Sequence, residues 1–295
     1  MAFDIQRIRK STRRVTKFLN KNVKRPSSAA IHNLRTSSRT LETSLVTLGL
    51  DSKGKVRRLL HDIGDVRKHA GKVRDMDVLT ADAVTLKQDG EEDCLVQLLE
   101  YLGAERTKHV KELRRLINRS TPQLRRNLER NSKRLEKVLR RAGDNRTRSD
   151  VIADTMARII QLSAELHSPI RLNRNNLHPY RLKVKELRNV LQLSDRADDH
   201  ILLKKLGEVK DAIGEWHDWV GLRSIAGQLL DHGTSCKLIK RLKKTSDSKY
   251  EHALSLANRV RNQYLTARER KRGNRMSKIA PSIPVLKATS AIATR

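Results

Sequence analysis

The chain has 295 residues, of which 64 are Lys or Arg and 33 are Asp or Glu, so its formal net charge at pH 7 is +31. Such an excess repels itself in a compact molecule, which favours a polyanionic partner: a nucleic acid, polyphosphate or an anionic membrane surface. A basic protein adapted to an acidic or high-salt habitat is the less favoured explanation. Aromatic residues make up only 3% of the chain, which argues against a protein that stacks single-stranded bases on aromatic side chains.

Periodic apolar residues predict helices along nearly the whole chain, near 3–21, 27–49, 53–87, 91–118, 121–141, 149–167, 178–194, 199–231 and 234–272. Alternating strand patterns are absent. Long helices joined by short turns, such as the turn predicted at Ser120-Thr121-Pro122, favour an all-α fold of antiparallel helical bundles. The periodicity is lost near the end, so residues 276–295 are predicted to form a flexible tail.

One motif occurs twice in the chain. HNLRTSSR runs from His32 to Arg39, and HPYRLKVK runs from His178 to Lys185, 146 positions later. Its recurring residue types, His, Arg and Lys, are those that bind anions.

A second motif follows each copy of the first. GKVRD at 71–75 is echoed by GEWHD at 214–218, 143 positions later. Two motifs in the same order and at nearly the same spacing indicate an internally duplicated fold, with halves at 1–145 and 148–272.

The first motif places its basic residues on one face of a helix. His32, Arg35 and Arg39 are spaced i, i+3, i+7 and so lie within a narrow wedge, opposite a stripe of leucines. The second copy is more basic, with four residues on the same face: His178, Arg181, Lys185 and Arg188. Glu42 stands where the first copy would match Arg188.

Two facing stripes would line a cleft suited to a linear polyanion, if the halves pack about a pseudo-twofold axis. Guanidinium groups bind phosphate oxygens in pairs, and Lys adds compact point charges. The histidine heading each stripe either packs near the helix start or hydrogen-bonds phosphate. A metal role is disfavoured, because no second His or carboxylate stands at i+3 or i+4.

No combination of an activated nucleophile or paired carboxylates predicts an enzyme. Asp75 and Asp218 are interpreted as partners that orient the Arg and His groups. Gly71 and Gly214, in predicted helix interiors where glycine costs about 1 kcal/mol, suggest a close helix approach or room for a ligand.

Cys94 and Cys236 lack metal-ligand spacing and indicate a reducing compartment. No apolar run approaches the ~20 residues that cross a bilayer.

Two strongly basic runs lie outside these motifs. Residues 106–148 carry 16 Lys and Arg against four acids, and residues 237–278 carry 14 against three. A protein that binds nucleic acid non-specifically would use these runs and would need no central stripe.

The repeated motifs resemble those of a CHAD domain, the conserved histidine α-helical domain, over about residues 3–272. The resemblance implies two four-helix bundles related by pseudo-twofold symmetry and a basic groove that binds inorganic polyphosphate. Carried onto this sequence, it implies a polyphosphate site made of His32, Arg35, Arg39, Arg67, Arg74, His178, Arg181, Lys185, Arg188 and Lys210. His217 replaces the second copy's counterpart of Arg74, and Thr40 replaces the family's frequent second Arg, so the first stripe is expected to bind more weakly.

The sequence therefore predicts a non-catalytic polyphosphate-binding protein without cofactor or metal. It is expected to be cytoplasmic and associated with polyphosphate granules. Three other hypotheses stay open: a nucleic-acid-binding protein that uses the basic runs, a metal-dependent enzyme acting on phosphate, and a granule scaffold.

Overall fold

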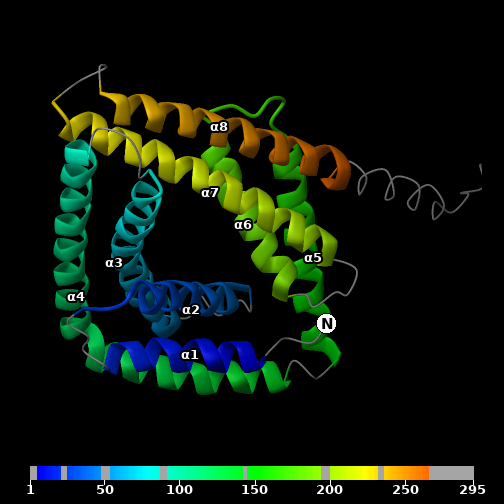
Figure 1. The fold of residues 1–295 in the computed structure, drawn as a ribbon. Helices are drawn as coiled ribbons and strands as arrows, with labels where there is room; N and C mark the ends of the chain where they lie inside the picture. Colours follow the sequence, from blue (N-terminus) through cyan, green and yellow to red (C-terminus); the bar gives the residue numbers. More distant parts are fainter. Residues whose placement is uncertain are drawn as a thin grey trace, which may run out of the picture.

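The structure is a computed structural model that describes residues 5–20, 25–47, 54–86, 92–141, 145–193, 200–231 and 236–265. Every regular element in these ranges is helical, which confirms the predicted all-α class (Figure 1). The elements are α1 (Ile5–Asn20), α2 (Ser28–Thr47), α3 (Gly54–Val84), α4 (Glu92–Arg141), α5 (Asn145–His167), α6 (Leu177–Leu193), α7 (His200–Leu229), α8 (Lys237–Val260) and the π-helical turn η3 (Arg261–Leu265). The predicted tail, 276–295, lies outside the described residues.

The prediction of separate helices at 91–118 and 121–141 is wrong, because one helix, α4, joins both ranges and runs through Pro122. Proline removes one backbone donor and pushes against the preceding turn, which bends a helix without always ending it. Figure 1 shows the consequence: the teal part of α4 runs beside α3, and the green part turns to run along α1. One helix therefore forms two sides of the first half.

Side-chain oxygens order the start of α2 and the turn before α6, the two helices that carry the basic stripes. Before α2, the Ser27 hydroxyl accepts a hydrogen bond from the Ala30 N–H at 3.2 Å. Before α6, the Asn173 side-chain oxygen accepts from the N–H groups of Asn175 and Asn176, at 2.9 and 3.3 Å. The Ser27 oxygen satisfies a donor that a helix start leaves unpaired, and the Asn173 oxygen holds the turn that leads into α6.

Each half of the chain forms a closed four-helix bundle around its own core. In the first half α1 packs on α2, α2 on α3, α3 on α4 and α4 on α1, around residues such as Ile31, Leu34 and Ile63. In the second half α5 to α8 enclose residues such as Leu166, Leu187 and Leu206, with η3 closing the ring between α8 and α5. The two bundles predicted from the duplication are therefore present.

A third core, which the sequence analysis did not anticipate, joins the two halves. It combines side chains of α3 and α4, such as Leu98, with side chains of α7 and α8, such as Trp219 and Leu222. Across the same junction α3 packs on α7 and α2 packs on α6. Each of these helices meets its own counterpart in the duplication, which is the arrangement expected near a pseudo-twofold axis.

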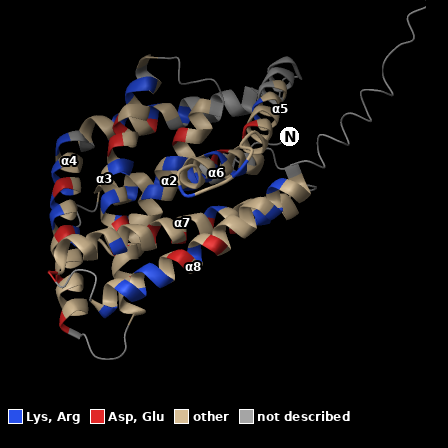
Figure 2. Ribbon diagram, turned by 90° about the horizontal axis from the view of Figure 1, so that it is seen from above, with Lys and Arg blue, Asp and Glu red and all other residues tan. Residues whose placement is uncertain are grey.

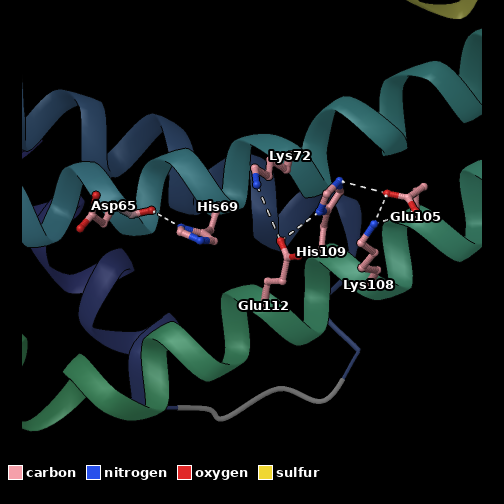
Figure 3. A network of polar contacts seen from close by, with 7 residues as sticks. All are labelled: Asp65, His69, Lys72, Glu105, Lys108, His109 and Glu112. Atoms are coloured by element: carbon pink, nitrogen blue, oxygen red, sulfur yellow. Dashed lines mark hydrogen bonds and ion pairs between the residues drawn. The ribbon is translucent and has the colours of Figure 1, made fainter. Parts of the chain in front are cut away.

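Ion pairs add to the apolar contacts between α3 and α4. On one face, His109 of α4 lies between Glu105 and Glu112, and Glu112 also reaches Lys72 of α3 (Figure 3). On another face, the largely buried Asp77 accepts a 2.6 Å hydrogen bond from Arg106. The Arg106 guanidinium also donates to the Pro26 carbonyl at 2.9 Å, and this ties α3 and α4 to the turn that precedes α2.

The shared core is testable with two substitutions on α7. Leu222 is fully buried in the core, whereas Val220 is 38% exposed. Leu222→Ala is expected to lower the free energy of unfolding by about 2–5 kcal/mol, because it leaves a cavity in packed surroundings. Val220→Ala is expected to cost less than about 1 kcal/mol. Urea unfolding followed by circular dichroism measures both, and equal costs would contradict a core shared by the two halves.

Candidate functional site: a basic groove between the two halves

The basic stripes of α2 and α6 meet where these helices pack against each other (Figure 2). A cavity of about 190 Å³ opens between them, with one further wall from α7. It is lined by Thr36, Arg39, Thr40, Thr43, Lys185, Arg188, Asn189, Gln192 and Lys210. Four predicted site residues, Arg39, Lys185, Arg188 and Lys210, thus surround one space, although they come from both halves of the chain.

Two arginines of the stripes lie over the two glycines of the second motif. A Cβ at Gly71 would lie 3.5 Å from the Arg35 Nη1, and a Cβ at Gly214 would lie only 2.6 Å from the Arg181 Nη2. The space beside each glycine is therefore taken by an arginine of the neighbouring helix. This accounts for glycine in a helix interior, where its conformational freedom costs stability.

These two arginines are further held by polar contacts on the facing helix. The Arg35 Nη1 donates to the Asp75 carboxylate at 3.2 Å and to the Gly71 carbonyl at 3.4 Å. The Arg181 Nε donates to the Lys210 carbonyl at 3.0 Å. A backbone carbonyl thus holds the matched arginine in each half, and in the first half a side-chain carboxylate accepts from it as well.

A second pair of glycines, Gly64 and Gly207, lies one heptad before the first pair and was not predicted from the sequence. Gly207 lies under Arg188, whose Nε is 3.5 Å from the position of an added Cβ, whereas nothing lies within 4 Å of that position at Gly64. The difference follows from the sequence, because Glu42 stands at the place of Arg188 in the first half. The 143-residue offset that relates Gly71 to Gly214 also relates Gly64 to Gly207, so this signal was present in the sequence.

The remaining basic residues of the cavity differ in how they are paired. The Arg188 Nε is buried and has no hydrogen-bond partner among the described residues. The Lys210 ammonium lies 2.5 Å from the Asp211 carboxylate, but that carboxylate is largely exposed to solvent. An exposed ion pair contributes little energy, so Lys210 is readily available to an anion, and the second half presents the less compensated charge.

Like charges raise the electrostatic potential around Arg39. Its burial, together with the nearby Arg67 and Arg35 guanidinium groups, lowers the pKa of Arg39 to about 10, against the opposing effect of Glu42. The Arg181 guanidinium contributes in the same direction across the groove. Arg39 remains charged at neutral pH, so the site concentrates positive charge where water only partly screens it, and this favours a bound anion.

The histidines predicted to head the stripes lie beside the cavity and do not line it. The His178 ring packs on His217 with centroids 4.3 Å apart. Burial and the neighbouring Arg181 lower the pKa of His178, and burial, His178 and Arg181 lower that of His217. Burial and then Arg74 and Arg35 lower the pKa of His32. The three rings are therefore mainly neutral at pH 7 and contribute hydrogen-bonding nitrogens rather than fixed charge.

Arg74 has a structural contact away from the cavity. Its Nη1 donates to the Ser28 hydroxyl at 2.8 Å, at the start of α2.

Burial raises the pKa of Asp218 to about 6, against the opposing charge of Arg181. Asp82 and Asp75 lie close enough to raise it further. A group of aspartates thus borders the arginines on the α3 and α7 side, away from the cavity lining.

The described residues contain no cluster of three or more His, Cys, Asp or Glu side chains suited to a metal ion. Within the same part of the chain, no helix combines the length and the apolar character needed to span a bilayer.

Comparison with known proteins identifies the fold. A family model described as the CHAD domain matches residues 6–226. The crystal structure of the CHAD domain from the plant Ricinus communis is similar, with a TM-score of 0.54 and 15% sequence identity over 90% of each chain. At this identity the similarity shows the fold alone. The curated proteins give no match.

The glycine–arginine contacts predict different outcomes for two equivalent substitutions. Gly71→Ala is expected to raise the free energy of unfolding by up to about 1 kcal/mol, because alanine is the better helix former and its methyl group fits beside Arg35. Gly214→Ala is expected to give a free energy of unfolding about 1 kcal/mol below that of Gly71→Ala, because its methyl group displaces Arg181 from the Lys210 carbonyl. Urea unfolding of both variants is the measurement, and equal gains would contradict the tighter contact at Gly214.

The partly buried ring of His178 predicts a dependence of stability on pH. Because its pKa in the folded state is lowered, the unfolded chain takes up the proton first, and this contribution to stability is lost as the pH falls through about 6.5. Asp218 acts in the opposite sense: its raised pKa costs stability above about pH 6, and the cost disappears on acidification. His178→Gln is therefore expected to lose less stability than the unsubstituted protein between pH 7.5 and 5.

Thermal unfolding at several pH values measures this difference. His252→Gln, which removes a histidine from the exposed face of α8, is the control and is expected to leave the pH dependence unchanged. Parallel curves for His178→Gln and the unsubstituted protein would refute a destabilising effect of protonation at the His178–His217 pair.

Proposed function

The chain belongs to the CHAD domain family, and we propose that it binds inorganic polyphosphate, without catalysis, in the groove between α2 and α6. The observation that carries the proposal is the meeting of two duplicated basic stripes at one cavity. Arg39 from one half and Lys185, Arg188 and Lys210 from the other line a space of about 190 Å³. Cations gathered in this way, with a buried guanidinium nitrogen left unpaired, favour an anionic ligand.

A linear polyphosphate suits these groups for physical reasons. Its phosphates share bridging oxygens, so negative charge recurs at short intervals along a narrow chain. Guanidinium groups hold such oxygens in pairs, and Lys adds charge without demanding one geometry. Binding releases the counterions condensed on the polymer, which makes it strong and dependent on salt. Arg39, Lys185, Arg188 and Lys210 are the proposed contacts, with Arg35, Arg67 and Arg181 adding to the potential.

The other predicted residues receive supporting roles in this proposal. His32 and His178 border the groove at the heads of the stripes, where a neutral ring can donate one hydrogen bond to a phosphate. Arg74 supports the start of α2 through Ser28. The protein is proposed to act in the cytoplasm, in association with polyphosphate granules.

Nucleic-acid binding is the competing function, and one observation favours it. Several basic residues of the two runs lie exposed on α4 and α8, among them Arg115, Arg125 and Arg126 on α4 and Lys240, Lys243 and Lys244 on α8. Figure 2 shows Lys and Arg over much of the fold, including α8. Exposed charge of this kind binds any polyanion in proportion to its charge, so the two functions differ in which residues they require.

Two double variants that remove the same charge separate the functions. The double variant Lys185→Ala, Arg188→Ala removes two cations from the α6 side of the groove. The double variant Lys243→Ala, Lys244→Ala removes two exposed cations from α8. The groove variant is expected to weaken polyphosphate binding about ten- to a hundredfold at near-physiological salt, because two phosphate contacts are lost. The α8 variant is expected to change it less than about threefold.

Binding is measured with labelled long-chain polyphosphate, with and without duplex DNA as competitor, and circular dichroism confirms that both variants fold. Equal losses in the two variants, or displacement of polyphosphate by DNA in proportion to phosphate, would favour generic electrostatic binding over the groove. Release of phosphate from polyphosphate in buffer with Mg²⁺, abolished by a chelator, would contradict a non-catalytic role.

A further inference from the structure

We propose that Glu42 makes the groove selective for polyphosphate over nucleic acid. Its carboxylate pairs with Arg67 in the absence of ligand, so that only a ligand with closely spaced phosphates can displace the carboxylate and bind Arg67. The inference rests on the proposed function, and it concerns the half of the groove that departs from the duplication. It assigns a role to a carboxylate that stands among the cations of the site.

The Glu42 carboxylate forms an ion pair with Arg67 that includes one hydrogen bond, while the buried Arg67 Nε makes a close contact without hydrogen-bond geometry. Its Oε2 lies 2.9 Å from the Arg67 Nε, and its Oε1 accepts a 3.3 Å hydrogen bond from the Arg67 Nη2. The two side chains are 31% and 24% exposed, so water screens the pair less than it would screen a surface ion pair. The carboxylate thus supplies Arg67 with an anionic oxygen in the place where a phosphate oxygen could bind.

The second half lacks such an internal anion. Arg188 replaces Glu42, and among the described residues no carboxylate pairs with it. Its buried Nε, like that of Arg67, has no hydrogen-bond partner there. Lys210 replaces Arg67, and its acidic neighbour Asp211 is 71% exposed. A polyanion therefore finds available cations in the second half, where binding starts, and an already paired guanidinium in the first half.

The unpaired cations and the Glu42–Arg67 pair belong to one site. Arg39 lines the cavity together with Arg188 and Lys210, and Arg67 is the charge with the largest effect on the pKa of Arg39. Glu42 opposes that effect, so it reduces the potential that a ligand meets beside Arg39. Breaking the pair loses the contact between Glu42 and Arg67 and leaves the carboxylate next to the incoming anion, and both effects cost energy.

This cost separates ligands by their charge density. Polyphosphate presents adjacent phosphates that can engage Arg39 and Arg67 together and so replace the carboxylate. Nucleic acid spaces its phosphates with sugars, presents fewer oxygens to the groove, and offsets less of the cost. Glu42 thus weakens all anion binding but weakens nucleic-acid binding more.

Glu42→Gln tests the inference, because the amide keeps the size of the side chain and removes its charge. Polyphosphate affinity is expected to rise about three- to tenfold at near-physiological salt, and the slope of log affinity against log salt is expected to steepen by about 0.7, as one phosphate contact is gained. Affinity for single-stranded DNA of equal phosphate number is expected to rise by a larger factor, so the preference for polyphosphate falls.

The matched control is Glu186→Gln on α6. Glu186 also pairs with an arginine, Arg158 of α5, but both side chains are more exposed than Glu42 and Arg67, and neither lines the groove. This variant makes the same change in net charge and is expected to alter either affinity less than twofold. Equal gains in the two variants would show a general charge effect and overturn the inference.

A second background isolates Arg67. If Glu42 acts by occupying this guanidinium, Glu42→Gln is expected to give little gain when Arg67 is already Ala. An equal gain in both backgrounds would overturn the inference, as would an unchanged or weakened affinity of Glu42→Gln, or an unchanged ratio of polyphosphate to DNA affinity. Circular dichroism confirms folding of each variant.

The proposed function and this inference fail in different ways. If the groove does not bind polyphosphate, the Lys185→Ala and Arg188→Ala double variant retains the affinity of the unsubstituted protein. If only the inference is wrong, the double variant loses affinity while Glu42→Gln does not show the expected gain in affinity and loss of preference.

Discussion

The groove exists because apolar packing holds like charges together that would otherwise move apart. Burial and then the neighbouring Arg67, Arg35 and Arg181 guanidinium groups lower the pKa of Arg39 to about 10. Nothing among these groups attracts the others. The free energy that offsets this repulsion comes from the two bundle cores and from the third core at the α3–α7 junction, because burial of apolar surface is the main favourable term in folding. The stability of the cores therefore sets how much uncompensated charge the site can carry.

The fold follows from the sequence more completely than the site does. Helix periodicity and the repeated motifs predict two helical bundles, because a packed helix must bury one face at regular spacing. The same rule did not anticipate the third core. Leu98, Trp219 and Leu222 lie on faces that resemble any other buried face, and the sequence does not say which helix each will meet. The break predicted at Pro122 failed for a similar reason, since one lost hydrogen bond does not decide whether a long, well-packed helix ends.

At the site, spacing along one helix was predictable and partnership between helices was not. The i, i+3, i+7 pattern correctly places Arg35 and Arg39 on one side of α2. It cannot show that Arg35 fills the space beside Gly71, or that His178 packs on His217. Those contacts depend on how α2 meets α3 and how α6 meets α7. The glycines were the better signal, because at three of the four repeated positions, Gly71, Gly207 and Gly214, an arginine of the neighbouring helix lies close.

The duplication explains the architecture, and the departures from it suggest where function was adjusted. A symmetric groove would have placed a guanidinium over Gly64 as Arg188 lies over Gly207. The chain instead places Glu42 on Arg67 and leaves the Gly64 position open. Exchange of a cation for a carboxylate lowers the repulsion around Arg39 and so favours folding, while it lowers the attraction for an anion. A single residue, Glu42, thus affects anion affinity and folding stability in opposite directions: it weakens the binding of polyanions and strengthens the fold.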